Sequence, residues 1–580
     1  MLKKTFFLFI VITIVLLTSC PNDSDPAPAK DPELTLQEDQ PSRLEDQPSA
    51  EALAALFSEA DGFPASLSNS WKIWGHHNAL ITQGFGADPS VMVYKDRVYV
   101  VASNDSLEYT DTGLNSIVNY ESGIQGMRLL SSGDLANWTD HGLINAGNLP
   151  QWKNPLYPMP APIASFESRS WAPSMVWKKM GGKDKFFIYF ANSGNGIGVI
   201  SADSPTGPWS SPLNKLLIDR ETPNCSDVAN LFDPGVLVDR DGKAYMYFGG
   251  GGDGLDSGMG RRVKLGDDMI SLDGTPETWT APCLFEDSEI ANIDDIYYYS
   301  YCTNGASNSL GLAGYQIAYM TGFEPLGKFS NPKGIMRPPQ AQFSTQDENN
   351  HHCIFQFKNK IYIAYHASNV ARAMGLGRYR STQIDKVPVN DDGEFTTITM
   401  TKKGVDQVGK FDPYALNEAE TIGIQGGVYT RPESDAGNGM LVTSIDTGDW
   451  LALYGVDFGS AGAKKITVRV RMPEDADYAG AIELRLDPDG DGEIADNGTL
   501  SATNTARIKG GEVIGRVQLK AKAGEAGKYA AVTADLDETV TGTHDLVFVF
   551  YSSLGVHPET VRPDSRHKNG FEFDRWQFKK

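Results

Sequence analysis

One short sequence pattern occurs five times between residues 87 and 366. Each copy begins with a polar residue, continues as an apolar strand, turns, and returns as a strand rich in Tyr and Phe. In the clearest copy, LFDPGVLVDRDGKAYMYFGG at 231–250, Asp241-Gly242 separates two apolar runs, which is a strong signal for a β-hairpin. An isolated hairpin cannot bury its faces, so the five copies are expected to share a core. The other copies lie at residues 87–102, 172–191, 286–302 and 351–366.

The spacing of the copies indicates the architecture. Their opening residues are 84, 61, 53 and 65 residues apart, close to the length of a four-stranded propeller blade with its loops. Weaker strand pairs follow several copies, as in residues 126–142 and 315–330. The sequence therefore predicts an all-β protein with a five-bladed β-propeller, whose first strands open toward a common axis. The five openers are Asp88, Ala172, Asp233, Glu286 and His351.

The N-terminal residues have the features of a secretory signal. Lys3 and Lys4 precede an apolar run at 6–17, and small residues lead to Cys20. The segment Leu17–Cys20 resembles a bacterial lipobox, whose cysteine is acylated; a plain signal peptide with a chance cysteine is the alternative. We expect residues 1–20 to be a lipoprotein signal peptide with lipidation at Cys20. The protein would then be exported and lipid-anchored to the bacterial cell envelope, with no other contact to the membrane.

Composition limits the remaining possibilities. Residues 21–70 are rich in Pro, Ala, Ser and acidic side chains, which predicts a disordered linker. The net charge of −23 argues against nucleic acid or an anionic membrane surface as a ligand and is compatible with a neutral polymer. The other four cysteines form no CxxC pair, so zinc is not expected, and buried free thiols are the simplest interpretation for Cys302 and Cys353.

Several stretches of the body resemble glycoside hydrolase family 43, a family of inverting glycosidases with a five-bladed propeller. The similarity is greatest to its arabinoxylan arabinofuranohydrolase branch. It extends in order through the predicted propeller, residues 71–408. The matching stretches include GADPSVMVYKDRVYV, SSGDLANWTDHG, SWAPSMVWKK, LFDPGVLVDRDGKAYMYFGGG, FEDS, YYYSYC, NNHHCIF and RYRSTQIDKV.

The resemblance assigns three catalytic acids. It implies that Asp88 is the general base, that Asp233 modulates the pKa of the proton donor, and that Glu286 is the general acid. Inversion requires one carboxylate to activate water and one protonated carboxyl to protonate the leaving oxygen, and a third carboxylate helps to keep a neighbour protonated. The alternative for Asp88 and Asp233 is that they only cap turns before proline. Near Glu286 the chain has Glu289, Ala291 and Asn292 where the branch usually has Gly, His and Lys.

The resemblance also implies groups around the sugar. His351 matches a histidine on the propeller axis that often holds water or a metal ion. A metal ion at this position, in addition to the calcium ion described in the next paragraph, is a further expectation. Arg380 matches an arginine that closes the fifth blade near the sugar, with Arg378 as the alternative. Trp171 is a candidate for stacking on a sugar, and packing in the core is an equally good interpretation of it.

Residues 409–580 change to short alternating strands, which predicts a β-sandwich (jelly-roll) module. This part resembles carbohydrate-binding module family 6. That resemblance implies a structural calcium held by Glu418, Glu420 and Asp574, oxygen ligands of the kind calcium prefers. Thr443-Ser444 replaces the usual Gly-Tyr, so one sugar-stacking aromatic is missing from the usual cleft. Asp446, Trp450 and Asn569 are further candidate sugar contacts, and an acidic loop at 487–491 is a second candidate calcium site.

Together these features predict an inverting glycoside hydrolase that removes α-L-arabinofuranosyl side chains from arabinoxylan and acts as a monomer. A β-xylosidase or an endo-arabinanase of the same family are alternatives within the enzyme class. A non-catalytic surface lipoprotein that binds glycans is the alternative from another class. The intact set of Asp88, Asp233 and Glu286 argues against loss of catalysis.

Overall fold

The computed structural model describes most of the chain between residues 67 and 580. The signal peptide, Cys20 and most of the linker fall outside the described residues, as do Arg378 and Asn569. In the described ranges no helix is long and apolar enough to cross a membrane. The described residues are 67–105, 109–110, 113–114, 124–146, 163, 169–343, 349–374, 379–433, 439–475, 477–494, 504–521, 526–554 and 570–580.

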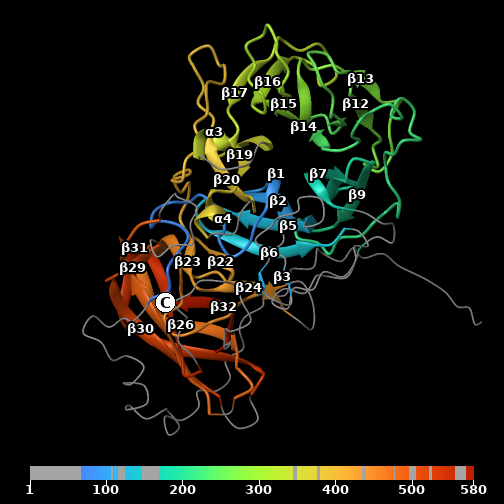
Figure 1. Ribbon diagram of the computed structural model, residues 1–580. Coiled ribbons are helices and arrows are strands. Elements are labelled where there is room, and N and C mark those ends of the chain that lie inside the picture. Colours follow the sequence, from blue (N-terminus) through green and yellow to red (C-terminus); the bar gives the residue numbers. More distant parts are fainter. Residues whose placement is uncertain are drawn as a thin grey trace, which may run out of the picture. The chain divides into compact units, whose positions relative to one another are not determined.

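Five antiparallel sheets follow one another along residues 87–386 (Figure 1). The first contains β1 (Ala87–Tyr94), β2 (Arg97–Asp105), β5 (Ile124–Ser132) and β6 (Trp138–Ile144). The second contains β7 (Trp171–Met180), β8 (Lys183–Ala191) and β9 (Ile197–Ala202). The third contains β10 (Gly235–Val238), β11 (Ala244–Phe248), β12 (Gly260–Leu265) and β13 (Glu277–Trp279). The fourth contains β14 (Leu284–Ile293), β15 (Ile296–Thr303), β16 (Ile317–Gly322) and β17 (Lys333–Met336). The fifth contains β18 (His352–Phe357), β19 (Lys360–Ala367) and β20 (Ser381–Lys386). Short elements lie between them: β3 (Tyr109–Thr110), β4 (Gly113–Leu114), α3 (Pro339–Phe343) and α4 (Asn369–Ala373).

The five sheets close into a ring. Their first strands contact one another in the order β1, β7, β10, β14, β18 and back to β1. Hydrogen bonds cross three of these seams: Met175 N donates to Ser90 Oγ at 3.0 Å, Val236 N to Ser174 Oγ at 3.0 Å, and Val91 N to Cys353 Sγ at 3.4 Å. The prediction of a five-bladed β-propeller is confirmed.

Each seam between neighbouring blades is filled by its own hydrophobic cluster. Met92 and Val101 of the first blade pack with Met175 and Ile188 of the second. The other four seams are filled in the same way, and the last cluster joins the fifth blade to the first. This arrangement follows from strand geometry, because alternate side chains point to opposite faces of a sheet and each face meets a different neighbour.

The strand registers show which residues occupy equivalent places in the blades. Asp88, Ala172 and Asp233 each precede a proline and have positive φ angles of 49°, 41° and 49°. In the fourth blade Asp287 has this backbone conformation, with φ of 65°. Glu286 pairs with Cys302 in the fourth blade as Trp171 pairs with Ala191 in the second. Glu286 therefore corresponds to Trp171, the residue before Ala172. The prediction that Glu286 is the equivalent of Asp88 is therefore wrong by one position. The irregular register between Glu286 and Glu289 has counterparts between Ala87 and Ser90 and between Trp171 and Ser174, so Asp287, not Glu286, corresponds to Asp88.

The C-terminal part is rich in sheet, as predicted. Its main sheet has nine strands, in which β26 and β31 are long and carry register shifts along their shared ladder. A buried apolar cluster lines it, including Leu451, Phe548 and Trp576. The strands are β21 (Asn417–Glu418), β23 (Ile424–Gly426), β24 (Tyr429–Pro432), β25 (Met440–Thr443), β26 (Trp450–Arg471), β27 (Ala479–Leu486), β30 (Glu512–Lys520), β31 (Tyr529–Ser552) and β32 (Glu572–Lys579), with β28 (Asp489–Asp491) and β29 (Arg507–Lys509) as a separate pair.

The C-terminal part also completes the first blade. Strand β22 (Thr421–Ile422) pairs with β6, so that the first sheet gains a fifth strand. Arg128 of β5 forms an ion pair of 2.7 Å with the fully buried Asp140 of β6. Thr430 of β24 donates a hydrogen bond of 2.7 Å to the same carboxylate. The sequence pattern did not predict this shared edge.

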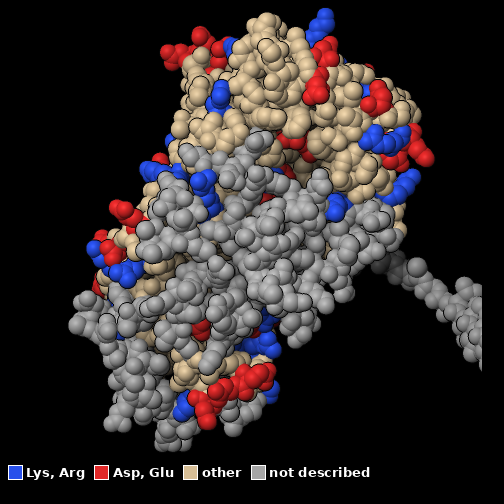
Figure 2. All heavy atoms as spheres, viewed as in Figure 1, with Lys and Arg blue, Asp and Glu red and all other residues tan. Residues whose placement is uncertain are grey.

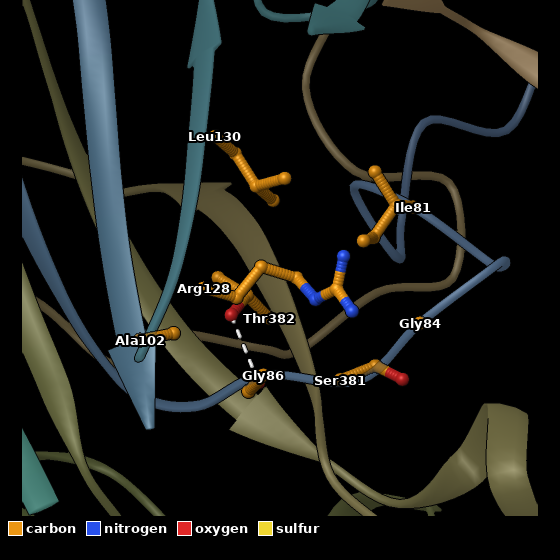
Figure 3. Close-up of a pocket in the computed structure, with 8 residues that line it drawn as sticks. All are labelled: Ile81, Gly84, Gly86, Ala102, Arg128, Leu130, Ser381 and Thr382. Carbon is orange, nitrogen blue, oxygen red and sulfur yellow. Dashed lines mark hydrogen bonds between the residues drawn. The ribbon is translucent and has the colours of Figure 1, made fainter. Parts of the chain in front are cut away.

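Figure 3 shows the surroundings of Arg128. Its guanidinium lies against the backbone of Gly84, where an added Cβ would come within 2.7 Å of the guanidinium carbon. Thr382 donates a hydrogen bond of 2.9 Å to the Gly86 carbonyl beside it. The cavity between these groups has about 10 Å³, roughly the room of one water molecule. It is a gap in the seam between the first and fifth blades and is too small for a sugar.

Candidate active site

Asp88 lies at the entry of β1 and is buried, with 6% of its surface exposed. Arg380 donates a hydrogen bond of 2.9 Å from Nη1 to its Oδ1. The Asp88 amide donates to His366 Nδ1 at 3.0 Å, and the same ring nitrogen lies 3.3 Å from Oδ1. Burial by itself raises the pKa of Asp88, but Arg380, His366 and His351 outweigh it and hold this pKa well below its ordinary value. Asp88 is therefore an ionised carboxylate.

Arg380 is held by a second aspartate. Asp105, the last residue of β2, accepts hydrogen bonds of 2.9 Å from Nε and Nη2 and another of 2.9 Å from the Arg380 amide. Arg380 is buried as well, with 2% of its surface exposed. The structure thus places Arg380 as the charge partner of Asp88. Sequence reasoning missed Asp105 and His366. Each is a polar residue near the end of the second strand of its blade, β2 for Asp105 and β19 for His366. That position was the sequence feature by which both could have been found.

Asp233 and Glu286 have pKa values shifted the other way. Burial and the charge of Asp88 raise the pKa of Asp233 to about 7, although the Asp287 amide, 3.0 Å from Oδ2, and Arg380 act against the increase. Burial, followed by the charges of Asp233 and Asp88, raises the pKa of Glu286 well above its ordinary value. The Oε1 atom of Glu286 is buried and has no hydrogen-bond partner among the described residues. Glu286 is therefore protonated near neutral pH.

His351 joins the aspartates on the axis. Its Nδ1 lies 3.7 Å from Asp88 Oδ1 and 3.9 Å from Asp233 Oδ2, and its Nε2 lies 3.0 Å from Asp287 Oδ1. Burial raises the pKa of Asp287 to about 7, with His351 acting against it. Sequence reasoning overlooked Asp287, because it concentrated on the glutamate one position earlier. No group of three or more His, Cys, Asp or Glu side chains in the described ranges is arranged as a metal site.

Trp171 and Glu289 belong to the first strands of the second and fourth blades. Trp171 opens β7 at the position that Glu286 occupies in the fourth blade; its ring is partly buried and lies 6.0 Å from the Arg169 guanidinium. Burial, followed by the charge of Asp287, raises the pKa of Glu289 well above its ordinary value, and Glu289 contacts Cys353 across the seam to the fifth blade. The Cys353 thiol is free, as are the other cysteines of the described residues.

The three predicted calcium ligands lie close together. Arg575 donates to Glu418 at 2.8 Å, and Asp574 is paired with Arg469. Burial raises the pKa of Glu420 well above its ordinary value, and the charges of Glu418 and Asp574 add to this. The Oε2 atom of Glu420 is buried and has no hydrogen-bond partner in the described part of the chain. The unpaired carboxylate oxygen of Glu420 is suited to a cation, but the two arginines already balance Glu418 and Asp574, and the three acids are not arranged as a metal site.

The charge distribution agrees with a polysaccharide ligand better than with a polyanion. On the face shown in Figure 2, acidic side chains lie both on the outer rim of the propeller and on the C-terminal part, with basic ones interspersed. Further acidic atoms are visible in a recess of the propeller on this face.

A closed five-bladed propeller with one ionised carboxylate and three carboxyls of raised pKa on its axis has the acid and base that glycoside hydrolysis requires. The fold and the site thus define a glycosidase. The chain belongs to glycoside hydrolase family 43: residues 78–395 match the family described as glycosyl hydrolases family 43. Residues 418–580 match the carbohydrate binding module of family 6.

Known relatives are similar over most of this chain. The chain is 37% identical to an arabinoxylan arabinofuranohydrolase from Bacillus subtilis, over 91% of this chain and 97% of that protein. It is 41% identical to an arabinoxylan arabinofuranohydrolase from Paenibacillus polymyxa, over 72% of this chain and 66% of that protein. A crystal structure of a Bacillus subtilis arabinoxylan arabinofuranohydrolase in complex with cellotetraose superposes with a TM-score of 0.76 at 36% identity, covering 88% of this chain and 99% of that one.

Proposed function

We propose that this protein is an inverting glycosidase that removes α-L-arabinofuranosyl side chains from arabinoxylan. The observation that carries the proposal is the separation of pKa values on the axis: Asp88 is held ionised by Arg380, while burial and neighbouring charge keep Glu286 protonated. The substrate class is the one named for the two arabinoxylan arabinofuranohydrolases to which this chain is similar.

The three acids divide the reaction between them. Asp88 takes a proton from a water molecule as the oxygen of that water attacks the anomeric carbon. The glycosidic C–O bond breaks, and Glu286 gives its proton to the leaving oxygen of the xylan chain. The charge of Asp233 raises the pKa of Glu286 and so helps to keep Glu286 protonated until that moment. His351, next to Asp88 and Asp233, keeps the aspartates apart and orients them.

The test is to incubate the full chain with arabinoxylan and to identify the released sugars. Free arabinose is the expected product. Release of xylose would favour a β-xylosidase, and arabino-oligosaccharides released from arabinan would favour an endo-arabinanase; either result would refute the proposed substrate. Binding without any release would favour a glycan-binding protein.

Two variants test the assigned roles. Asp88→Asn removes the base and Glu286→Gln removes the proton donor, and each is expected to lower kcat by about 10²–10⁴-fold. Glu394→Gln is the matched control, because Glu394 is an exposed carboxylate of the propeller that pairs with Lys333. Two acid variants as active as this control would show that the site is wrongly assigned.

We also propose a structural calcium ion in the C-terminal part, held by Glu418, Glu420 and Asp574. The unpaired Oε2 atom of Glu420 supports it. The acidic loop is less suited, since Arg507 and Lys509 already pair with Asp491. A second ion at His351 stays a prediction.

The N-terminal sequence supports a further proposal about location. A charged start, an apolar run and Cys20 suggest export and lipid anchoring at the cell envelope. As a separate proposal, the protein acts as a monomer. Metabolic labelling with a fatty acid tests the lipid anchor, since a Cys20→Ala variant should lose the label. Equal labelling of both proteins would contradict the lipid anchor at Cys20.

A further inference from the structure

Asp287 is a buried carboxylate at the centre of the propeller that the reaction described above does not use. It directly follows Glu286 in β14 and has none of its surface exposed. Its backbone has the positive φ found at Asp88 and Asp233, so three of the five blades place an aspartate at this position. The Asp287 amide donates to Asp233 Oδ2. The main chain of Asp287 therefore fixes Asp233, which leaves the role of its side chain to be explained.

The side chain connects the fourth blade to the fifth. Its Oδ2 accepts a hydrogen bond of 3.1 Å from the His352 amide and is also bonded to His352 Nδ1. On the other side of that ring, Ser300 lies 2.7 Å from His352 Nε2. Burial lowers the pKa of His352 to about 3, so this ring is neutral and has a single proton. A proton on Nδ1 facing the carboxylate and a bare Nε2 facing the Ser300 hydroxyl satisfy all of these groups.

The other oxygen of Asp287 faces the axis. Its Oδ1 lies at an ion-pair distance of 3.0 Å from His351 Nε2, and no described group meets the geometry of a hydrogen bond to this oxygen. His351 Nδ1 faces Asp88 and Asp233. A carboxylate on one ring nitrogen of a histidine fixes the orientation of the ring and the position of its proton. Without this partner the ring of His351 could turn away from Asp88 and Asp233.

We propose that the Asp287 carboxylate is a positioning residue for the glycosidase reaction: it holds His351 in place, with a proton on Nε2, against Asp88 and Asp233. This inference rests on the proposed function, because Asp88 and Asp233 matter only if they act on a glycoside. It goes beyond that function by giving a task to a residue that the reaction described above does not use.

The variant Asp287→Asn tests the proposal in the full chain. It keeps the shape of the side chain and the amide that supports Asp233, but it presents an acceptor to only one of the two histidines. We expect kcat to fall about 10–100-fold, the usual cost of removing a partner that orients a functional group. KM on arabinoxylan and the melting temperature should change little, because the substrate contacts and the core are retained.

A matched control separates this role from general damage to the propeller. Asp385 of β20 is also buried and accepts hydrogen bonds from Tyr365 at 2.6 Å and from the Thr401 amide at 2.8 Å. Asp385→Asn should lose a similar amount of stability and keep the kcat of the unaltered protein. A folded Asp287→Asn protein with the kcat of this control would overturn the proposal.

A second measurement uses the unaltered protein, so its outcome does not depend on the folding of a variant. Nitrogen NMR of the histidine rings in the unaltered chain reports which nitrogen of His351 carries a proton. A proton on Nε2 is the expected result, and a bare Nε2 would overturn the proposal. This readout is independent of turnover, so it still decides the matter if the protein releases no arabinose and the proposed function fails.

Discussion

At the scale of single residues, the guanidinium of Arg380 decides the charge of the site. It is shared between Asp88 and Asp105, and all three side chains are buried. Burial alone would favour protonation of Asp88, and among the groups that oppose this effect Arg380 has the largest influence. Asp105 in turn keeps the cation in place, which makes it part of the same unit.

This dependence predicts the effect of Arg380→Gln on the pH profile. Asp88 must be ionised to act, so activity is lost as the pH falls through its pKa. Removing the guanidinium raises that pKa, and the acidic limb of kcat/KM should move to higher pH by about 1–3 units, the usual effect of one opposite charge. The alkaline limb, which follows the deprotonation of Glu286, should move much less.

The measurement is kcat/KM against pH for both proteins, with Arg240→Gln as the control. Arg240 is an exposed arginine of the third blade that pairs with Asp295. An acidic limb that stays in place in folded Arg380→Gln protein would contradict the explanation given for Asp88.

Sequence reasoning found part of this site and missed the rest for physical reasons. Asp88 and Asp233 open repeated strands before proline, a pattern that can be read along the chain. Asp105 and His366 act on Asp88 from the ends of second strands, and only the folded ring brings them there. Glu286 was aligned with Asp88 by its place in the sequence pattern, whereas the strand pairings align Asp287 with Asp88, and these pairings cannot be read from a single strand.

At the scale of elements, the closeness of β10 and β14 depends on a residue without a side chain. Gly235 lies where Ser90 and Ser174 lie in the first two blades, and a Cβ at this position would come within 2.0 Å of the Ser288 carbonyl oxygen and 2.8 Å of Glu289 Cα. The serines reach their neighbouring blades through a hydroxyl, whereas the third blade meets the fourth with its backbone. That contact supports the segment containing Glu286 and Asp287.

Gly235→Ala is therefore expected to push the third and fourth blades apart. The free energy of unfolding should fall by about 1–3 kcal/mol, as for overpacking elsewhere, and kcat should fall because Glu286 moves with Ser288. Urea unfolding and steady-state kinetics measure the two effects. The control is Gly305→Ala, where the nearest atom to an added Cβ is 3.9 Å away. Equal stability of the two variants would show that the seam can absorb a methyl group.

The element scale is also where the sequence was most informative. Alternation of apolar residues and the turn at Asp241-Gly242 predicted hairpins, and the structure has β10 and β11 on either side of that turn. The spacing of the copies then indicated propeller blades, and the number of copies predicted five of them. The pairing of β22 with β6 could not be predicted, because two residues carry no periodicity and their partner lies far away in the sequence.

At the scale of the whole molecule, the propeller and the C-terminal part share buried polar contacts. Arg128 and Asp140 of the first blade and Thr430 of the C-terminal part form one such group. Arg128→Met would leave Asp140 buried without its cation, which costs about 3–5 kcal/mol in comparable cases. Calorimetry should show a lower melting temperature for both parts in one transition.

The control for this prediction is Lys185→Met, which removes an exposed partner of Asp203 and should have little effect. If only one of two separate transitions shifted in Arg128→Met protein, the two parts would not unfold together and the prediction would be wrong.

The proposed calcium ion also belongs to this scale, because Glu420 lies beside Asp140 of the first blade as well as beside Glu418 and Asp574. An ion that binds only the folded state stabilises it by about 2.7 kcal/mol when its free concentration is one hundred times its dissociation constant. Chelation should therefore lower the melting temperature of the full chain, and Glu420→Gln should abolish the response.

Asp491→Asn is the matched variant for calcium, since it alters the acidic loop and leaves Glu420 in place. It should keep the response to chelator. A full chain whose melting temperature is indifferent to both calcium and chelator would refute the ion, and a response lost only in Asp491→Asn would move it to the loop.

The strand that the C-terminal part adds to the first blade has a consequence for how such proteins can be cut and recombined. A chain ended at residue 408 would leave the outer edge of β6 with unpaired amides and carbonyls, and an open edge of this kind readily pairs with another molecule. The catalytic propeller alone would then tend to aggregate or to associate edge to edge. An exchange of binding modules between such enzymes would have to carry residues 421–422, or a substitute strand, along with the catalytic part.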